Sequence, residues 1–356
     1  VIRLDADIVV TGGSGTYEVP YQFGKMKGTT TVVEYVQNLY NDGSKITAVN
    51  IGGNTGNPEV NLNTTQGIML DNNGDYRYYG ANPNNYVSYN GELWRIISVG
   101  NVKASAIDTV GETRAKIIKN SILLDDNGLS EYSWDSSASD VNSGSGVGDW
   151  SQADLMTELN TLYFNSDSGI CYIESNNSST ACNFTNTGLS EEAKKLTSDA
   201  LYYLGGSKTH LGLYADDWYT IERGTTVWGA TSGQTCNDAA CPRATTWTGR
   251  IGIIYPSDYA YATDLSVCTE SLNNYAEDIC KSNNWFVRGY GEDMTITPNL
   301  FNTGSSVYVI SWSGAFGTGN GGVDNAAGVR PVQYLRSGVK IVAGKGSSEN
   351  PYILGI

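Results

Sequence analysis

The chain has 356 residues and a mass of 38.3 kDa, and its 22 basic against 37 acidic side chains give a formal charge of −15 and an isoelectric point near 4.4. This negative charge repels nucleic-acid phosphates and anionic lipid, which excludes both as expected partners. Hydrophobic residues make up 40% of the chain and charged residues 17%, which excludes a disordered chain. No apolar run approaches the roughly 18 residues that span a bilayer, so we expect no membrane span.

The first expected element, residues 1–30, repeats the C-terminus of the chain. Residues 1–23 align without gaps on residues 332–354, and each copy predicts an alternating strand, a glycine turn and a second short strand entered through Pro-Tyr. The identical positions are Val1, Leu4, Gly13, Gly15, Glu18, Pro20 and Tyr21, which match Val332, Leu335, Gly344, Gly346, Glu349, Pro351 and Tyr352.

The repeat has two explanations, which remain open at this point. Either the chain is cut from a tandem array, or the leading copy pairs with a neighbouring subunit. The second explanation makes residues 1–30 a strand-exchange segment. Its candidate subunit-interface residues are Leu4, Ile8, Val10, Gly13, Gly15, Pro20 and Tyr21.

Residues 31–70 are expected to form a helix and a Gly/Asn-rich connector. Val32, Val36, Leu39 and Tyr40 have helical spacing before a glycine stop. Residues 41–74 predict turns and short strands.

Residues 71–356 are expected to form one α+β domain, closed by residues 332–354. Tyr86–Tyr89 and residues 92–99 predict a hairpin around Asn90-Gly91, because this pair accepts the positive φ of a type I′ turn. Residues 114–124 predict a second strand pair. Late strands are expected within residues 305–316 and 328–335.

Helices are expected between these strands. Ser151 opens one helix with Asp154 in the capping-box position, and its buried face is Leu155, Leu159, Leu162 and Tyr163. A second follows Ser190 and runs to the Gly205-Gly206 stop. Residues 250–262 predict a buried strand that turns into a short helix. Strands at both ends with helices between them favour an α+β fold that is rich in β structure.

Six cysteines form three local clusters. The clusters are Cys171 with Cys182, Cys236 with Cys241, and Cys268 with Cys280. Six cysteines permit fifteen pairings, and the clustering favours the three local ones. Zinc is the competing interpretation, but no Cys-x-x-Cys occurs and no histidine lies near any pair. We therefore expect disulfide-stapled loops and an oxidising location, which means secretion or a cell surface.

No arrangement of residues predicts a catalytic centre. The single histidine, His210, has no serine elbow or reactive-cysteine signature around it. Asp71, Asn73 and Asp75 predict a turn rather than a calcium loop, because Tyr76 stands where an EF-hand needs glycine. We expect no cofactor and no metal site, with a structural calcium at residues 125–128 or at Asp216 and Asp217 as the alternative. A sugar-stacking face, or its alternative of packing beneath the disulfide loops, involves Trp218, Tyr219, Trp228 and Trp247.

Several segments carry a family resemblance. The residues that carry it are the strand ending ELWRII, then Pro256, Ser257, Tyr259 and Ala262, and finally the closing Gly328 and Arg330. Together they resemble the formylglycine-generating-enzyme branch of the C-type-lectin-like fold, with Val329 in place of an aromatic residue. The WSQADLM segment and the glycine turn followed by NPY are similar to domains of surface and pilin-like proteins of low-GC Gram-positive bacteria. The resemblance covers residues 71–356 and implies a C-type-lectin-like core. That branch's oxidase activity needs a late cysteine pair, and no cysteine follows Cys280, so we expect no enzyme.

The leading functional hypothesis is a structural subunit of an extracellular bacterial surface filament, such as a pilus or fimbria. Identical subunits would join head to tail by β-strand complementation, because one copy of the repeat completes the chain's own sheet and the other is free to complete a neighbour's. The alternative is a cell-surface adhesin module that binds glycans. A surface hydrolase that uses a carboxylate pair is a third class, and it rests only on abundant acidic residues.

Overall fold

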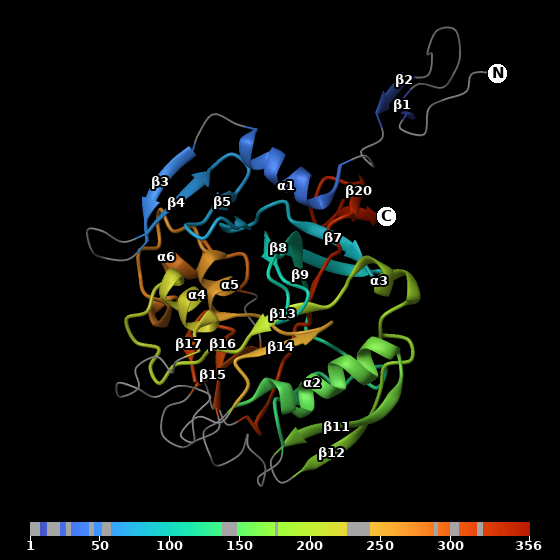
Figure 1. The fold of residues 1–356 in the computed structure, drawn as a ribbon, viewed down its shortest axis with the longest axis vertical. Coiled ribbons are helices and arrows are strands. Elements are labelled where there is room, and N and C mark those ends of the chain that lie inside the picture. The colour runs from blue at the N-terminus through green and yellow to red at the C-terminus, as the bar shows by residue number, and fades with distance from the viewer. Residues whose placement is uncertain are drawn as a thin grey trace, which may run out of the picture.

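The computed structural model describes residues 8–12, 22–25, 30–42, 46–51, 58–136, 148–174, 177–225, 243–287, 291–299, 306–318 and 323–356. The described part is rich in strands, and its helices are short (Figure 1). The helices are α1 (Val32–Asn41), α2 (Asp154–Glu158, continued by a π-helical turn at Leu159–Tyr163), α3 (Glu191–Leu196), α4 (Ala215–Arg223), α5 (Pro256–Tyr261) and α6 (Asp278–Lys281). Within the described residues, no helix is long and apolar enough to cross a membrane.

The strands of the main sheet and its branch are β3 (Ile46–Asn50), β4 (Glu59–Asn63), β5 (Ile68–Leu70), β6 (Tyr76–Tyr78), β7 (Tyr86–Tyr89), β8 (Glu92–Val102), β9 (Glu112–Lys119), β19 (Val332–Tyr334), β20 (Lys340–Ala343) and β21 (Tyr352–Gly355). The order is β20-β21-β7-β8-β6-β5-β4-β3, with β9 pairing with β8 and β19 pairing with β9. The last strands of the chain therefore lie at one edge of the sheet, beside β7.

The other strands form small sheets. They are β1 (Ile8–Gly12), β2 (Gln22–Lys25), β10 (Tyr132–Ser133), β11 (Ser168–Glu174), β12 (Ser178–Asn183), β13 (Ala200–Tyr203), β14 (Thr246–Gly249), β15 (Glu292–Asn299), β16 (Ser306–Ser311), β17 (Phe316–Gly317) and β18 (Ala326–Ala327). Their pairings are β1-β2, β10-β18, β11-β12, β13-β14 and β15-β16-β17.

The central strands of the main sheet are buried on both faces. Successive side chains of a strand point to opposite faces, so neighbouring residues enter different parts of the core. One hydrophobic cluster contains Ile68, Ile96 and Ile117. The other contains the next residue in each case, namely Met69, Ile97 and Ile118. The β8 and β9 segments consequently appear in the sequence as continuous apolar runs.

The structure confirms two local predictions. The β7–β8 hairpin turns at Asn90 (φ 55°) and Gly91 (φ 73°), as a type I′ turn requires. Helix α1 begins at Val32 behind a capping box, in which the Glu34 N–H donates to Thr31 Oγ1 (3.1 Å) and the Thr31 N–H donates to Glu34 Oε2 (2.9 Å).

Three local predictions are wrong. The helix after Ser190 ends at Leu196, and Ala200–Tyr203 forms strand β13 against β14, because tertiary pairing overrides the local helical propensity. Residues 114–124 contain one strand, β9, which pairs with β8 and β19, rather than a strand pair.

The third error concerns the start of helix α2. Asp149, rather than Ser151, accepts the capping hydrogen bond at this end, from the Ser151 N–H. The carboxylate of Asp154 instead accepts hydrogen bonds from Ser136.

The expected boundary between residues 70 and 71 falls between two paired strands. Strands β3, β4 and β5 continue the sheet that contains β6 and β8, and β5 pairs with β6 from Ile68↔Tyr78 to Leu70↔Tyr76. Residues 46–70 thus belong to the same sheet as the domain that follows them.

Candidate subunit interface

The C-terminal copy of the repeat forms a hairpin with an internal irregularity. Strands β20 and β21 are antiparallel, with Lys340 opposite Gly355, Ile341 opposite Leu354 and Ala343 opposite Ile353, so a bulge lies between Ile341 and Ala343. Gly344 turns the chain with φ +90°, and a Cβ atom there would lie 2.0 Å from the Pro351 carbonyl oxygen. Glycine is therefore required for the hairpin to close.

A defined surface of the domain receives this hairpin. We call it the hairpin seat, and it consists of Tyr35 on α1, Asn84, and Tyr86, Val87 and Ser88 on β7. Strand β21 lies parallel to β7, with Tyr352 opposite Val87 and Ile353 opposite Ser88. The backbone N–H of Tyr86 donates to the Gly346 carbonyl at 2.8 Å.

Two residues of the hairpin fit closely against the seat. A Cβ atom on Gly346 would lie 2.4 Å from the Asn84 carbonyl oxygen and 2.4 Å from the Tyr352 ring, so only glycine allows this approach. The Tyr352 side chain is 1% exposed, and its ring packs edge-on against Tyr35 with centroids 5.2 Å apart. Tyr352 thus contacts the seat through its side chain, whereas Gly346 approaches the seat and, with φ +82°, also belongs to the hairpin's own loop.

The outer edge of β20 is covered by the segment that leads into α1. The Val32 N–H donates to the Val339 carbonyl (2.8 Å), and the Ile341 N–H donates to the Thr30 carbonyl (3.2 Å). Thr31 also forms an isolated bridge with Lys340. These bonds occupy the edge at which a further strand would otherwise add.

The N-terminal hairpin has the same pairing as the C-terminal one. Strands β1 and β2 place Val9 opposite Gly24, Val10 opposite Phe23 and Gly12 opposite Gln22, with a register shift between Val10 and Gly12. Adding the repeat offset of 331 turns each of these pairs into a pair of β20 and β21. The repeat found in the sequence is therefore a repeat of backbone structure, including the bulge.

The N-terminal hairpin forms its own sheet. Among the described strand pairings, β1 and β2 bond only to each other, and Figure 1 shows them apart from the other strands. Of the predicted interface residues, Ile8 and Val10 lie in β1. Leu4, Gly13, Gly15, Pro20 and Tyr21 fall outside the described residues.

In the C-terminal copy, the residues that correspond to Leu4 and Tyr21 lie in the core. The counterparts Leu335 and Tyr352 are buried in the larger hydrophobic cluster. The seat residues Tyr35, Asn84 and Tyr86 were missed by the sequence analysis, because they are not repeated and only the fold brings them to the hairpin.

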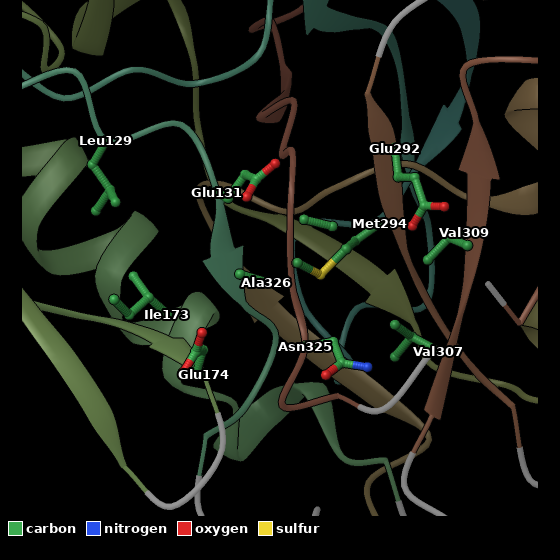
Figure 2. A pocket seen from close by; sticks show the side chains of 11 residues that line it. Leu129, Glu131, Ile173, Glu174, Glu292, Met294, Val307, Val309, Asn325 and Ala326 are labelled. Atoms are coloured by element: carbon green, nitrogen blue, oxygen red, sulfur yellow. The ribbon is translucent and has the colours of Figure 1, made fainter. Parts of the chain in front are cut away.

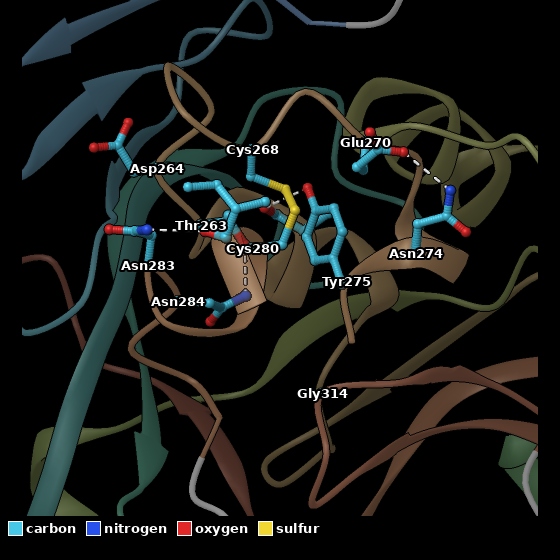
Figure 3. The surroundings of a disulfide bond; sticks show 12 residues. Thr263, Asp264, Cys268, Glu270, Asn274, Tyr275, Cys280, Asn283, Asn284 and Gly314 are labelled. Atoms are coloured by element: carbon cyan, nitrogen blue, oxygen red, sulfur yellow. Dashed lines mark hydrogen bonds between the residues drawn. A yellow bond between two sulfur atoms is a disulfide. The ribbon is translucent and has the colours of Figure 1, made fainter. Parts of the chain in front are cut away.

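Two of the three expected disulfides are present in the described residues. Cys171 and Cys182 join β11 to β12, and Cys268 and Cys280 join the segment after α5 to α6, where the bond lies beside Tyr275 and Thr263 (Figure 3). All four cysteines are buried. Cys236 and Cys241 fall outside the described residues.

A cavity of about 490 Å³ lies between β10, β11, β15, β16 and β18 (Figure 2). Glu131, Glu174 and Glu292 line it together with apolar side chains such as Met294 and Val307. The described lining contains acceptors for hydroxyl groups but no aromatic ring for sugar stacking. The three glutamates make the cavity a hollow of negative charge, and they are the side-chain type that the carboxylate-pair hydrolase considered above would use.

A buried charge network connects three elements on the other side of the core. Asp258 on α5 accepts hydrogen bonds from Lys116 on β9 and from the Tyr255 N–H (3.0 Å), and it pairs with Arg77 on β6 at 3.4 Å. Burial alone would raise the pKa of Asp258, but the charges of Lys116 and Arg77 lower it below its usual value.

Glu222 lies beside this network. Burial raises its pKa to about 7, although its carboxylate accepts hydrogen bonds from the Ser257 N–H (2.7 Å) and hydroxyl (2.5 Å). Every one of these polar groups has a protein partner, which is the arrangement of a structural network.

The other candidate residues are engaged in local structure. Asp125 accepts hydrogen bonds from Asn127, Leu129 and Asn183, and Asp217 from the Tyr214 N–H. Asp71 accepts turn hydrogen bonds from Asn73 and Asp75 and pairs with Arg77. The described residues contain no group of three or more His, Cys, Asp or Glu side chains able to hold a metal ion.

The aromatic candidates are largely inside the protein. Trp218 is fully buried against Tyr308 and Phe316, and Trp247 packs against Trp150 and Tyr202. Tyr219 is half-buried and stacks on Arg223, while Trp228 falls outside the described residues. His210 is half-buried beside Tyr308.

Comparison with known proteins identifies no relative. No protein-family model, no curated protein and no solved structure matches the chain.

Proposed function

We propose that this protein is a structural subunit of an extracellular bacterial surface filament, assembled head to tail by β-strand complementation. One observation carries the proposal: the N-terminal hairpin has the register and the bulge of the hairpin that completes the main sheet. The hairpin occurs twice, and the part of the chain that the structure describes contains one hairpin seat, which leaves one copy for another molecule.

The edges of the N-terminal hairpin support an assembly role. Unpaired backbone N–H and C=O groups along a strand tend to pair with another chain. The contact would join different surfaces of the two molecules, so it need not close, and it would extend into a fibre. The two disulfides agree with assembly outside the cell, where such bonds persist.

The test is assembly of the native, surface-derived protein and of the recombinant chain, by negative-stain electron microscopy with light scattering. We expect regular filaments from the full chain of 38.3 kDa and discrete monomers of correspondingly lower mass from a variant that lacks residues 1–25. The point variant Gly15→Val, which keeps the chain length, should lose assembly as well. Filaments of normal length from the deletion variant would overturn the proposal.

A further inference from the structure

The repeated residues show where the N-terminal hairpin fits. Some of them serve the hairpin itself, as Gly344 and Pro351 do in the C-terminal copy. Tyr352 serves docking, because its ring packs against Tyr35 of the seat, and Gly346 serves both the hairpin's own loop (φ +82°) and the close approach to Asn84. Their counterparts Gly15 and Tyr21 are retained in the N-terminal copy. A free hairpin with the same backbone would still need glycine at that position, because the φ of Gly346 is +82°, but it would not need a tyrosine that becomes buried.

Simple edge addition does not explain this pattern. Pairing at the edge of a sheet uses backbone groups and places little demand on side chains. The outer edge of β20 is in addition covered by residues 30–32. Insertion into the seat uses both the backbone register and the two docking residues.

Resting on the proposed function, we infer that the N-terminal hairpin of one molecule occupies the hairpin seat of a second copy of this chain, in place of β20 and β21. The repeat offset gives the register: Tyr21 lies opposite Val87 and Gln22 opposite Ser88, as Tyr352 and Ile353 do within one molecule. The Tyr86 N–H then donates to the Gly15 carbonyl.

Each molecule has one seat and two hairpins that compete for it. The chain's own hairpin is tethered, which gives it an effective concentration in the millimolar range. Exchange replaces one set of backbone pairs by an equal set, so the side chains decide between the two hairpins. The N-terminal copy has Val9 where the C-terminal copy has Lys340, but it has Gln22 where the C-terminal copy has Ile353 and Lys25 where it has Ile356, so apolar content does not favour the N-terminal copy.

Disulfide trapping between two full-length variants tests this register. The donor is Gln22→Cys. The acceptor is Ser88→Cys combined with Gly346→Val, which weakens docking of the acceptor's own hairpin. We expect a mixed-disulfide dimer on non-reducing gels, mapped by mass spectrometry to positions 22 and 88, at a yield several-fold above that of an Ile107→Cys acceptor, whose thiol stands at a 91% exposed position. The donor that also carries Gly15→Val should fall to the level of this control.

A second acceptor tests the same register without the Gly346→Val substitution. Ser88→Cys alone, mixed with a tenfold excess of donor, should give the same mapped linkage at lower yield. A yield at positions 22 and 88 no higher than the control with both acceptors would overturn the inference. Filaments without this linkage would support the proposed filament function and overturn insertion into the hairpin seat. The linkage without filaments would support insertion into the seat and overturn the filament function.

Discussion

A single buried carboxyl group, Glu158, sets a pH dependence of stability. One of its oxygens accepts a hydrogen bond from the Tyr172 N–H (2.7 Å), and the other has no hydrogen-bond partner. Burial raises the pKa to about 8, from 4.5 in an unfolded chain. The folded state therefore binds the proton more tightly. The resulting stabilisation is fully present below pH about 4.5 and is lost as the pH rises towards about 8.

We predict that Glu158→Gln raises the free energy of unfolding at pH 9, by an amount on the order of 2 kcal/mol, and has little effect at pH 5. The amide keeps the acceptor for Tyr172 and carries no charge to bury. Urea denaturation at both pH values measures the effect. Glu192→Gln, at a side chain that is 83% exposed, is the matched control and should change neither value. A wild-type stability equal to that of the variant at pH 9 would contradict the pKa.

At Gly346, as at Gly344, the backbone conformation and the contacts both require glycine. The φ of Gly346 is +82°, and the nearest obstacle to a Cβ atom includes backbone, which cannot rotate away. We predict that Gly346→Ala costs about 1–3 kcal/mol of stability. The control is Gly338→Ala, because nothing lies within 4 Å of a Cβ atom there. Thermal unfolding of both variants distinguishes them, and equal melting temperatures would rule out close docking at Gly346.

At the scale of elements, the two disulfides close loops of nearly equal length in different surroundings. Their sequence separations are 11 and 12 residues, so chain entropy predicts a loss of roughly 3 kcal/mol for removing either. Cys171–Cys182 joins strands that also share a ladder from Ser168↔Asn183 to Glu174↔Ser178. Cys268–Cys280 holds short turns with no such ladder.

We therefore predict a difference in local exchange when each pair is replaced by alanine. Amides of residues 264–283 should lose protection without Cys268–Cys280, whereas the paired amides of β11 and β12 should keep most of theirs without Cys171–Cys182. Hydrogen–deuterium exchange with mass spectrometry provides the readout. Equal loss of protection in both variants would show that the ladder does not hold the β11–β12 hairpin.

An element could be predicted from the sequence where the interactions that determine it are between residues close in the chain. The α1 capping box and the Asn90-Gly91 turn involve neighbours in sequence, so both were predictable. Strand β13 was not, because Ala200–Tyr203 is held by β14, more than forty residues later in the chain. For the same reason, no pattern within residues 114–124 showed that β9 would pair with β19.

At the scale of the whole molecule, the charge network around Asp258 joins distant parts of the chain. It brings together β6, β9 and α5, with Asp258 lying 142 residues from Lys116 and 181 from Arg77. Removing one partner of a buried network leaves an uncompensated charge, which costs more than the pair itself contributes.

We predict that Asp258→Asn lowers the free energy of unfolding by about 3–5 kcal/mol at pH 7. Because the folded pKa is lowered, the carboxylate's contribution is present above its unfolded pKa and disappears as the pH falls through the folded one. The loss relative to wild type should accordingly shrink in acid. Urea denaturation across pH 3–7 measures it, with the exposed Asp42→Asn as control. A constant difference over this range would argue against an ionised Asp258.

The sequence by itself determined the β-rich α+β character, the local cysteine pairing at two described sites, the first helix and the duplication of the terminal element. All of these depend on residues that are close in sequence or on a direct comparison of two segments. Only the tertiary structure decided that both copies share a register and a bulge, and that Gly346 and Tyr352 dock on Tyr35 and Asn84. Register is set by hydrogen bonds between strands, and the seat lies more than 250 residues before the hairpin that it receives, so neither leaves a periodic or spaced pattern in the chain.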